Sequence, residues 1–250
     1  MTDQSENGRT SLQVSTQRLR PAKQQLDHST KLGHSLFAGK AADSLRESII
    51  EGELASGWPL VEAQLSEQLQ VSRGPVRNAL QALEAEGLVK TLPNGRMVVV
   101  GFGPEDLHDL LATRLLLEST GVRLGLERSA SPAPVREAFE AIERVDPSSE
   151  LLVTLDIAFH RSLVSLSGSR FLVNSWLSLA PVLKSVIAVS SRRLARIAPA
   201  DHQRRIVDSH KTIVDAVESR DADAAVGMLR DQFGITNSMF TTTQSNWKGA

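Results

Sequence analysis

Three side chains in the second half of the chain could hold a metal ion. Asp156 and His160 lie four residues apart in a segment with helical periodicity, so both project from one face, about one turn apart. His210 lies on the apolar side of a later helical segment. A carboxylate with neutral imidazoles suits Zn, Mn, Fe or Ni rather than Mg or Ca. The alternative is that each is a solitary polar residue satisfied by its neighbours, because short motifs often match by chance.

Arg114 is a further residue with chemistry to offer in this half. It shares a helical side with leucines, so its guanidinium should reach inward, and an inward arginine needs an anion. Glu118, one turn further on, could be its structural partner. Alternatively, Arg114 clamps the carboxylate of a small-molecule effector, since a guanidinium recognises carboxylates through paired hydrogen bonds.

In the first half, a helical segment after Ser72 has residues suited to reading DNA. Its apolar side carries Val76, Ala79, Leu80 and Leu83, and its other side carries Gly74, Arg77, Asn78 and Gln81. Arginine and asparagine form paired hydrogen bonds with guanine and adenine edges in the major groove. Arg73 lies at the helix N-terminus, where free amides also attract phosphate. The alternative is an ordinary amphipathic helix with a solvated polar face.

The elements that position this segment follow from periodicity and from glycine and proline. A first helix is predicted over 41–53, and a short second helix contains Leu65 and Leu69. Ser72 can cap the third helix, which runs to about Glu86 with Pro75 in its first turn. Strands are predicted over 88–92 and 97–100, joined by a turn over 93–96. Three short helices and a hairpin make a winged helix-turn-helix.

Helical periodicity dominates the rest of the chain. The predicted helices are 105–128, 133–145, 150–167, 170–196, 201–219 and 221–240. The expected fold is therefore mostly α, with a winged helix-turn-helix followed by an all-α helical bundle. Arg192, Arg193 and Arg196 are expected to form a solvated helix face.

Length and composition favour two domains in a cytoplasmic protein. The 250 residues divide into a flexible tail (1–35), a DNA-binding domain (36–103), an effector-binding and dimerisation domain (104–240) and a terminal tail (241–250). The absence of cysteine excludes disulfide and thiolate chemistry. The polar N-terminal stretch lacks the apolar segment of a signal peptide, so neither export nor a membrane is expected. The net charge of −1 gives no general argument for nucleic acid.

The stretch from Val71 to Leu80, followed by the stretch from Leu83 to Val89, closely resembles the DNA-binding signature of the GntR family of bacterial regulators. The resemblance covers about 40–103 and implies that Arg73 and Arg77 contact DNA. It also implies that Gly95, at the wing tip, approaches the minor groove with Arg96 beside it. The full predicted DNA-binding set is Ser72, Arg73, Pro75, Arg77, Asn78, Gln81, Gly95 and Arg96. Gly74 departs from the family, where threonine is common, and the wing is one residue short.

The second half resembles the FCD effector domain of the FadR-type GntR subfamily over about 105–240. The resemblance is carried by the segments 107–118, 156–160 and 208–216. In metal-binding members one Asp and three His surround the ion, and the matching positions here are Asp156, His160, His210 and Gln232. Gln232 is a departure, because an amide oxygen is a poorer ligand than imidazole for these metals. The resemblance therefore implies a divalent transition metal (Zn, Mn, Fe or Ni) whose fourth ligand position is not filled by an imidazole.

The sequence predicts a ligand-responsive transcription repressor or activator. A homodimer would bind a palindromic DNA operator, and a small organic acid in the bundle would change the operator affinity. The alternative is a mononuclear metal-dependent hydrolase or lyase fused to a DNA-binding module. That alternative lacks a further candidate base at a motif spacing and a glycine-rich phosphate loop. The protein is therefore not expected to be an enzyme.

Overall fold

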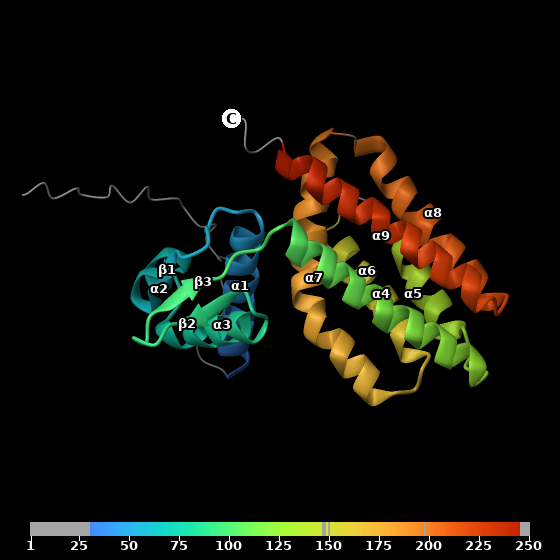
Figure 1. The fold of residues 1–250 in the computed structure, drawn as a ribbon, viewed down its shortest axis with the longest axis horizontal. Coiled ribbons are helices and arrows are strands. Elements are labelled where there is room, and N and C mark those ends of the chain that lie inside the picture. Colours follow the sequence, from blue (N-terminus) through green and yellow to red (C-terminus); the bar gives the residue numbers. More distant parts are fainter. Residues whose placement is uncertain (1–30, 147–148, 150, 198, 246–250) are drawn as a thin grey trace, which may run out of the picture.

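The computed structural model describes residues 31–146, 149, 151–197 and 199–245. A small part with a three-stranded sheet lies beside a larger, all-helical part (Figure 1). The elements of the small part are α1 (Lys31–Ile50), β1 (Pro59–Leu60), α2 (Glu62–Leu69), α3 (Arg73–Ala85), β2 (Val89–Thr91) and β3 (Met97–Val99). The helical part consists of α4 (Pro104–Glu127), α5 (Ala133–Arg144), α6 (Leu151–Ser165), α7 (Arg170–Ile197), α8 (Pro199–Glu218) and α9 (Ala222–Ser245). This architecture confirms the predicted fold class.

The small part is a winged helix-turn-helix. Its sheet has the strand order β1-β3-β2 with antiparallel pairing, and Val99 of β3 lies opposite Val89 of β2. The β1 strand was not predicted, because two residues are too short to show alternation. It is held by the tertiary pairing of Pro59 with Val98.

The reading helix α3 begins and ends close to the predicted residues. Ser72 occupies the N-cap position in extended conformation, although its hydroxyl makes no capping hydrogen bond. Gln70 adopts a left-handed conformation in the tight turn that separates α2 from α3. After α3, the chain turns at Gly87, whose positive φ of 78° is a conformation that glycine adopts without steric cost.

Two helices extend into the segments that were predicted as tails. Helix α1 begins at Lys31 rather than at Ala41, and α9 continues to Ser245. The early turns of α1 gain a tertiary contact that periodicity did not show, because Phe37 packs against the core. The remainder of the predicted tails, 1–30 and 246–250, lies outside the described residues.

Close packing of α4 on α6 holds the helical part together. A Cβ atom at Gly121 would lie 2.5 Å from the Cα of Val164, and one at Gly125 would lie 2.5 Å from the Cβ of Leu166. Both glycines are buried. They let the backbones of the two helices approach more closely than any larger residue would allow, and α6 carries Asp156 and His160 on this rigid support.

The two parts share one hydrophobic core. Buried side chains of α3, such as Leu80, belong to the same cluster as Trp176 and Leu183 of α7. At the edge of this contact, Arg192 of α7 pairs with Glu47 of α1 at 2.9 Å and with Glu51, directly after α1, at 3.1 Å. Arg192 is therefore an interdomain residue, and its predicted place on a solvated face is wrong. The side chains of Arg193 and Arg196 lie outside the described residues.

Helix α7 is unusually apolar. Within the described part of the chain, its stretch Arg170–Arg192 alone is long and apolar enough to cross a membrane by length and composition. A core helix of a globular protein has the same composition. Trp176, Leu183 and Val186 of α7 are fully buried in the shared core.

Candidate functional site

The polar side of α3 and the wing form one exposed face. The predicted DNA-contacting residues that are exposed are Ser72, Arg73, Arg77, Asn78, Gln81, Gly95 and Arg96. Pro75 is the exception, because its side chain is buried with the apolar side of α3. Pro75 favours the start of the helix, where its missing N–H is tolerated, and its predicted contact with DNA stays a prediction.

A groove of about 520 Å³ separates α3 from the wing, and two of the three arginines of the face, Arg77 and Arg96, line it. The wing is tied to α3 by Glu84, whose Oε1 accepts hydrogen bonds from the backbone N and the Oγ1 of Thr91, at 2.9 and 2.7 Å. Gly95 at the tip has a φ of 78°. The groove lies between a helix and a wing that both present arginines, as in a nucleic-acid interface, although Glu62 and Glu84 also line it.

Arg77 is held by a residue that sequence reasoning missed. Its Nε and Nη2 donate to Oε1 and Oε2 of Glu62, both at 2.9 Å, in a two-pronged pair across the α2–α3 turn. The pKa of the Glu62 carboxyl is lowered, first by this hydrogen bond from Arg77 and to a smaller extent by the charges of Arg77 and Arg73. Glu62 lies 15 residues before Arg77, a separation that no helical periodicity connects.

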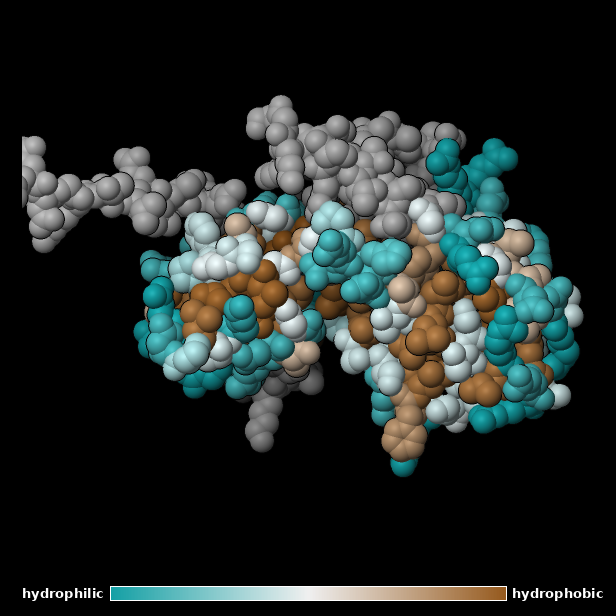
Figure 2. All heavy atoms as spheres, viewed as in Figure 1, coloured by the Kyte–Doolittle hydropathy of each residue, from teal (hydrophilic) through white to brown (hydrophobic). Residues whose placement is uncertain are grey.

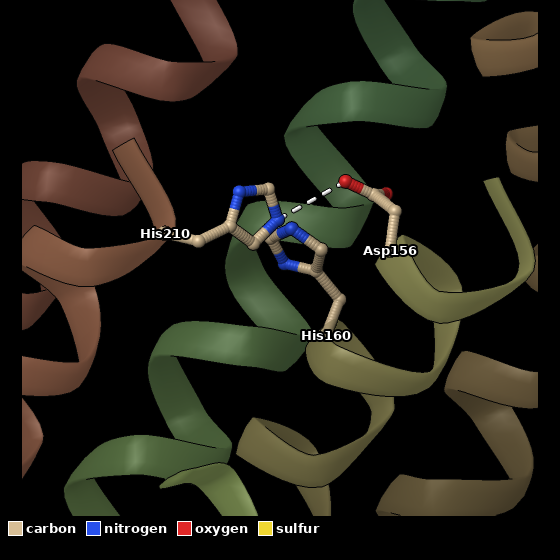
Figure 3. Close-up of side chains that lie close together, drawn as sticks. All are labelled: Asp156, His160 and His210. Atoms are coloured by element: carbon tan, nitrogen blue, oxygen red, sulfur yellow. Dashed lines mark ion pairs between the residues drawn. The ribbon is translucent and has the colours of Figure 1, made fainter. Parts of the chain in front are cut away.

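In the helical part, the three predicted metal ligands converge. Asp156 and His160 from α6 and His210 from α8 point toward one another (Figure 3). One ligand atom of each lies within 4.8 Å of the other two. Both imidazoles are fully buried, and the Asp156 side chain is 13% exposed.

The hydrogen bonds of both imidazoles leave the inward nitrogens with free lone pairs. His210 Nδ1 lies 2.7 Å from the carbonyl oxygen of Ile206, which can only accept, so Nδ1 carries the proton. His160 Nδ1 lies 2.8 Å from Glu118 Oε2 and donates to it in the same way. Each Nε2 is then an acceptor. His210 Nε2 faces another acceptor, Asp156 Oδ1, at 3.1 Å.

Charge states in the cluster suit a cation. Burial alone would raise the pKa of the Asp156 carboxyl, but His210 and His160, where their rings are protonated, and the Arg114 guanidinium lower it well below its usual range. Burial lowers the pKa of His160, and the charge of Arg114 lowers it further. The atoms Asp156 Oδ2, His160 Nε2 and His210 Nε2 are buried without a hydrogen-bond partner among the described residues. Unpaired buried lone pairs are costly, and a divalent transition metal would satisfy all three groups.

Glu118 organises the surroundings of this cluster. It accepts hydrogen bonds from Arg114 Nε (2.8 Å), His160 Nδ1 (2.8 Å) and Trp176 Nε1 (3.1 Å). Burial would raise its pKa, but Arg114 and His160 lower it to about 2. Of the two roles left open for Arg114, pairing with Glu118 is therefore present. The Nη atoms of Arg114 make no hydrogen bond to any described residue, so its outer edge stays available to a ligand.

Gln232 is near the cluster but on another side of it. Its Nε2 lies 3.5 Å from both His210 Nδ1 and Ser209 Oγ. The inward atom of His210 is Nε2, on the opposite side of the ring from this contact. The Gln232 side chain thus contacts His210, and its predicted place in the set of four ligands stays a prediction.

Two protein families match the chain. Residues 37–99 match the family described as bacterial regulatory proteins, gntR family, and residues 109–233 match the FCD domain. The gluconate operon transcriptional repressor of Bacillus licheniformis is 28% identical over 84% of this chain and 89% of its own length. An HTH-type transcriptional regulator of Streptomyces ambofaciens is 32% identical over 74% of this chain and 77% of its own length.

Solved structures share the fold. McbR/YncC of E. coli aligns over 83% of this chain and 98% of its own, with a TM-score of 0.59 and 18% sequence identity. Lar of Listeria monocytogenes aligns over 82% and 96%, with a TM-score of 0.62 and 15% identity.

Proposed function

We propose that a small organic acid bound in the helical domain controls the affinity of this protein for operator DNA. The chain belongs to the gntR family of bacterial regulatory proteins and has an FCD domain, so it is a transcriptional regulator rather than an enzyme. The carrying observation is the buried cluster of Asp156, His160 and His210, with Arg114 close enough to lower the pKa of Asp156. The unpaired lone pairs of Asp156, His160 and His210 suit a metal ion, and the outer edge of the Arg114 guanidinium suits an anion bound beside it.

The exposed face of α3 reads the operator. Arg73 and Arg77 are the base- and phosphate-contacting arginines, and Arg96 on the wing reaches the neighbouring minor groove. One helix reads few base pairs, so the protein acts as a homodimer on a palindromic site. Large apolar side chains that remain exposed in the helical domain, among them Leu116 and Phe171, support a dimer through this domain. Apolar side chains also form a band across this domain in Figure 2.

Asp156, His160 and His210 would hold Zn, Mn, Fe or Ni. Three protein ligands leave coordination positions open for water or for a ligand oxygen, and the bound ion supplies an electrophilic anchor for a carboxylate. The outer edge of Arg114 would hold the same carboxylate through paired hydrogen bonds. Glu118 fixes the tautomer of His160, as carboxylates commonly do behind metal-bound imidazoles.

Helix α7 offers the physical link between the two sites. Near its start, Trp176 donates to the same Glu118 that orients His160. Near its end, Arg192 pairs with carboxylates in and directly after the last turn of α1. A shift of α7 on effector binding would therefore move α1 and change the separation of the two reading heads in the dimer. The relatives that repress operons favour a cytoplasmic repressor.

The test of this proposal measures linked binding with the full chain. Calorimetric titrations with Zn or Mn, with and without a panel of small organic acids, should show one acid that tightens metal binding by the same factor as the metal tightens acid binding. Arg114→Met should weaken the acid and leave the metal affinity within a few-fold. A protein that stays metal-free at stoichiometric metal, and binds no acid of the panel, would refute this function for the cluster.

The DNA-reading face is tested separately. A short duplex that the wild-type protein selects from a randomised pool serves as the specific probe, and a scrambled duplex of equal composition as the non-specific one. Arg77→Ala should lose most of the discrimination between the two duplexes, and Arg73→Ala should weaken both. Unchanged binding of the selected duplex by both variants would show that α3 is not the reading helix.

A further inference from the structure

The pair between Glu62 and Arg77 joins a residue outside the reading helix to one of the two arginines of that helix. Glu62 opens α2, and its carboxylate engages both Nε and Nη2 of Arg77 at 2.9 Å. The Arg77 side chain nevertheless remains 62% exposed. Both residues line the groove between α3 and the wing. The guanidinium is therefore held on the DNA-facing surface rather than withdrawn from it.

A guanidinium has two usable edges, and this pair occupies only one. Its five N–H groups form a rigid planar fork, with Nε and Nη2 along one side and Nη1 and Nη2 at the end. Glu62 takes the side edge of Arg77. The end edge keeps two parallel N–H groups, which is the arrangement that matches O6 and N7 of guanine. A long, flexible side chain with one edge fixed loses less conformational freedom when the other edge binds.

Glu62 also opposes non-specific attraction. It lies close enough to Arg73 and Arg77 for both charges to lower the pKa of its carboxyl. On a phosphate-binding face, a carboxylate weakens attraction to any DNA backbone, whatever the sequence. Glu62 therefore lowers the affinity for non-specific DNA, and it also orders the Arg77 guanidinium that makes the specific contact. Both effects increase the ratio of specific to non-specific binding.

We propose that Glu62 is a specificity-determining positioning residue, which holds Arg77 by its side edge so that the end edge is presented to a base. This inference rests on the proposed DNA-reading function of α3. Glu62 acts through Arg77 and needs no base contact of its own.

The experiment compares Glu62→Gln with Glu67→Gln, which removes one exposed carboxylate from the same helix α2 without touching Arg77. Affinities of the full-length proteins are measured for the selected duplex and for the scrambled duplex, over a series of salt concentrations. Glu62→Gln should bind the scrambled duplex more tightly and the selected duplex less tightly, so that their ratio falls about tenfold for each half-site. Glu67→Gln should leave the ratio unchanged. An unchanged ratio for Glu62→Gln would overturn the proposal, and a raised ratio would show instead that Glu62 competes with DNA for Arg77.

A double-mutant cycle separates positioning from a structural role. Glu62 lies in the first turn of α2, where a carboxylate also favours the helix dipole, so its loss could act through α2 itself. In the Arg77→Ala background, Glu62→Gln should have no further effect on the ratio of affinities. An additive effect there would overturn the proposal while leaving α3 as the reading helix. If Arg73→Ala and Arg77→Ala both bind the selected duplex like the wild type, the DNA-reading function itself fails.

Discussion

Each half of the molecule contains an arginine paired with a glutamate, and the two pairs differ mainly in their exposure to water. Arg77 and Glu62 have side chains that are 62% and 34% exposed, whereas those of Arg114 and Glu118 are 7% and 2% exposed. Water screens the first pair, so the pair itself adds little to the free energy of unfolding. Low polarity around the second pair makes each charge depend on the other. The same type of ion pair therefore adds little stability on the DNA-reading face, whereas next to the cluster of Asp156, His160 and His210 it holds the side chains in fixed positions.

The largest expected effect is on stability, and it separates the two pairs. Glu118→Gln removes one charge of a buried pair and leaves Arg114 without full compensation, so the free energy of unfolding should fall by about 3–5 kcal/mol. Glu62→Gln removes the equivalent charge from the exposed pair and should leave that free energy nearly unchanged. Urea unfolding of both variants at neutral pH measures the difference. Equal losses in the two variants would show that burial does not distinguish the pairs.

A second prediction concerns the converging imidazoles. His160→Ala removes a ligand whose orientation is fixed by Glu118, and should lower the affinity for Zn or Mn by at least about a hundredfold. His108→Ala, an exposed histidine of α4, is the matched control and should bind metal like the wild type. Titration with a metal-sensitive dye gives both affinities. If His160→Ala retains wild-type affinity, the metal lies elsewhere or the cluster is only polar lining.

Glycine substitutions sharpen the comparison through packing. Gly121→Ala places a methyl group 2.5 Å from the backbone of α6 and should destabilise the protein by about 1–3 kcal/mol. Gly74→Ala in the reading helix meets nothing within 4 Å and should stabilise it by up to about 1 kcal/mol, as alanine does in an open helix. Thermal unfolding of the two variants should therefore shift in opposite directions. A Gly121→Ala protein that unfolds at or above the wild-type temperature would contradict the close approach of α4 and α6.

The smallest expected effect is at Gln232. Its amide contacts the Nδ1 side of His210, so a histidine there must reorient before it can reach a shared ion. Gln232→His should raise metal affinity by no more than about tenfold, since imidazole is the better ligand but starts from an unfavourable position. The dye titration used for His160→Ala measures it. A gain far above tenfold would mean that position 232 belongs to the ligand set after all.

Much of the fold was predictable because its signals are local. Apolar side chains at helical spacing, with proline and glycine between them, place α4 to α8 within a few residues of the observed bounds. The winged helix-turn-helix is predicted equally well by Pro75, Gly87 and the turn at 93–96. The strand β1 and the extension of α1 depend on tertiary contacts that leave no local pattern.

The candidate site was predictable in its residue types but not in its connections. Asp156, His160 and His210 could be selected from their spacing and their place on apolar faces. The residues that orient them could not, because Glu118 and His160 are 42 positions apart and Glu118 and Trp176 are 58 apart. Only folding brings such pairs together. The pairing of Glu62 with Arg77, 15 positions apart, could not be predicted for the same reason.

The core shared by the two parts limits how this regulator can be recombined. Related regulators with the same two domains can be combined by exchanging their effector-binding domains, and the sequence predicts the domain boundary near Gly103. Here Arg192 of α7 pairs with carboxylates at the end of α1 and directly after it. Trp176 and Leu183 of α7 lie in the same core as the reading helix. A transplanted sensory half would therefore meet a foreign α1 surface. Helices α1 and α7 would therefore have to be exchanged together, so a stable hybrid regulator should take both helices from the same parent protein.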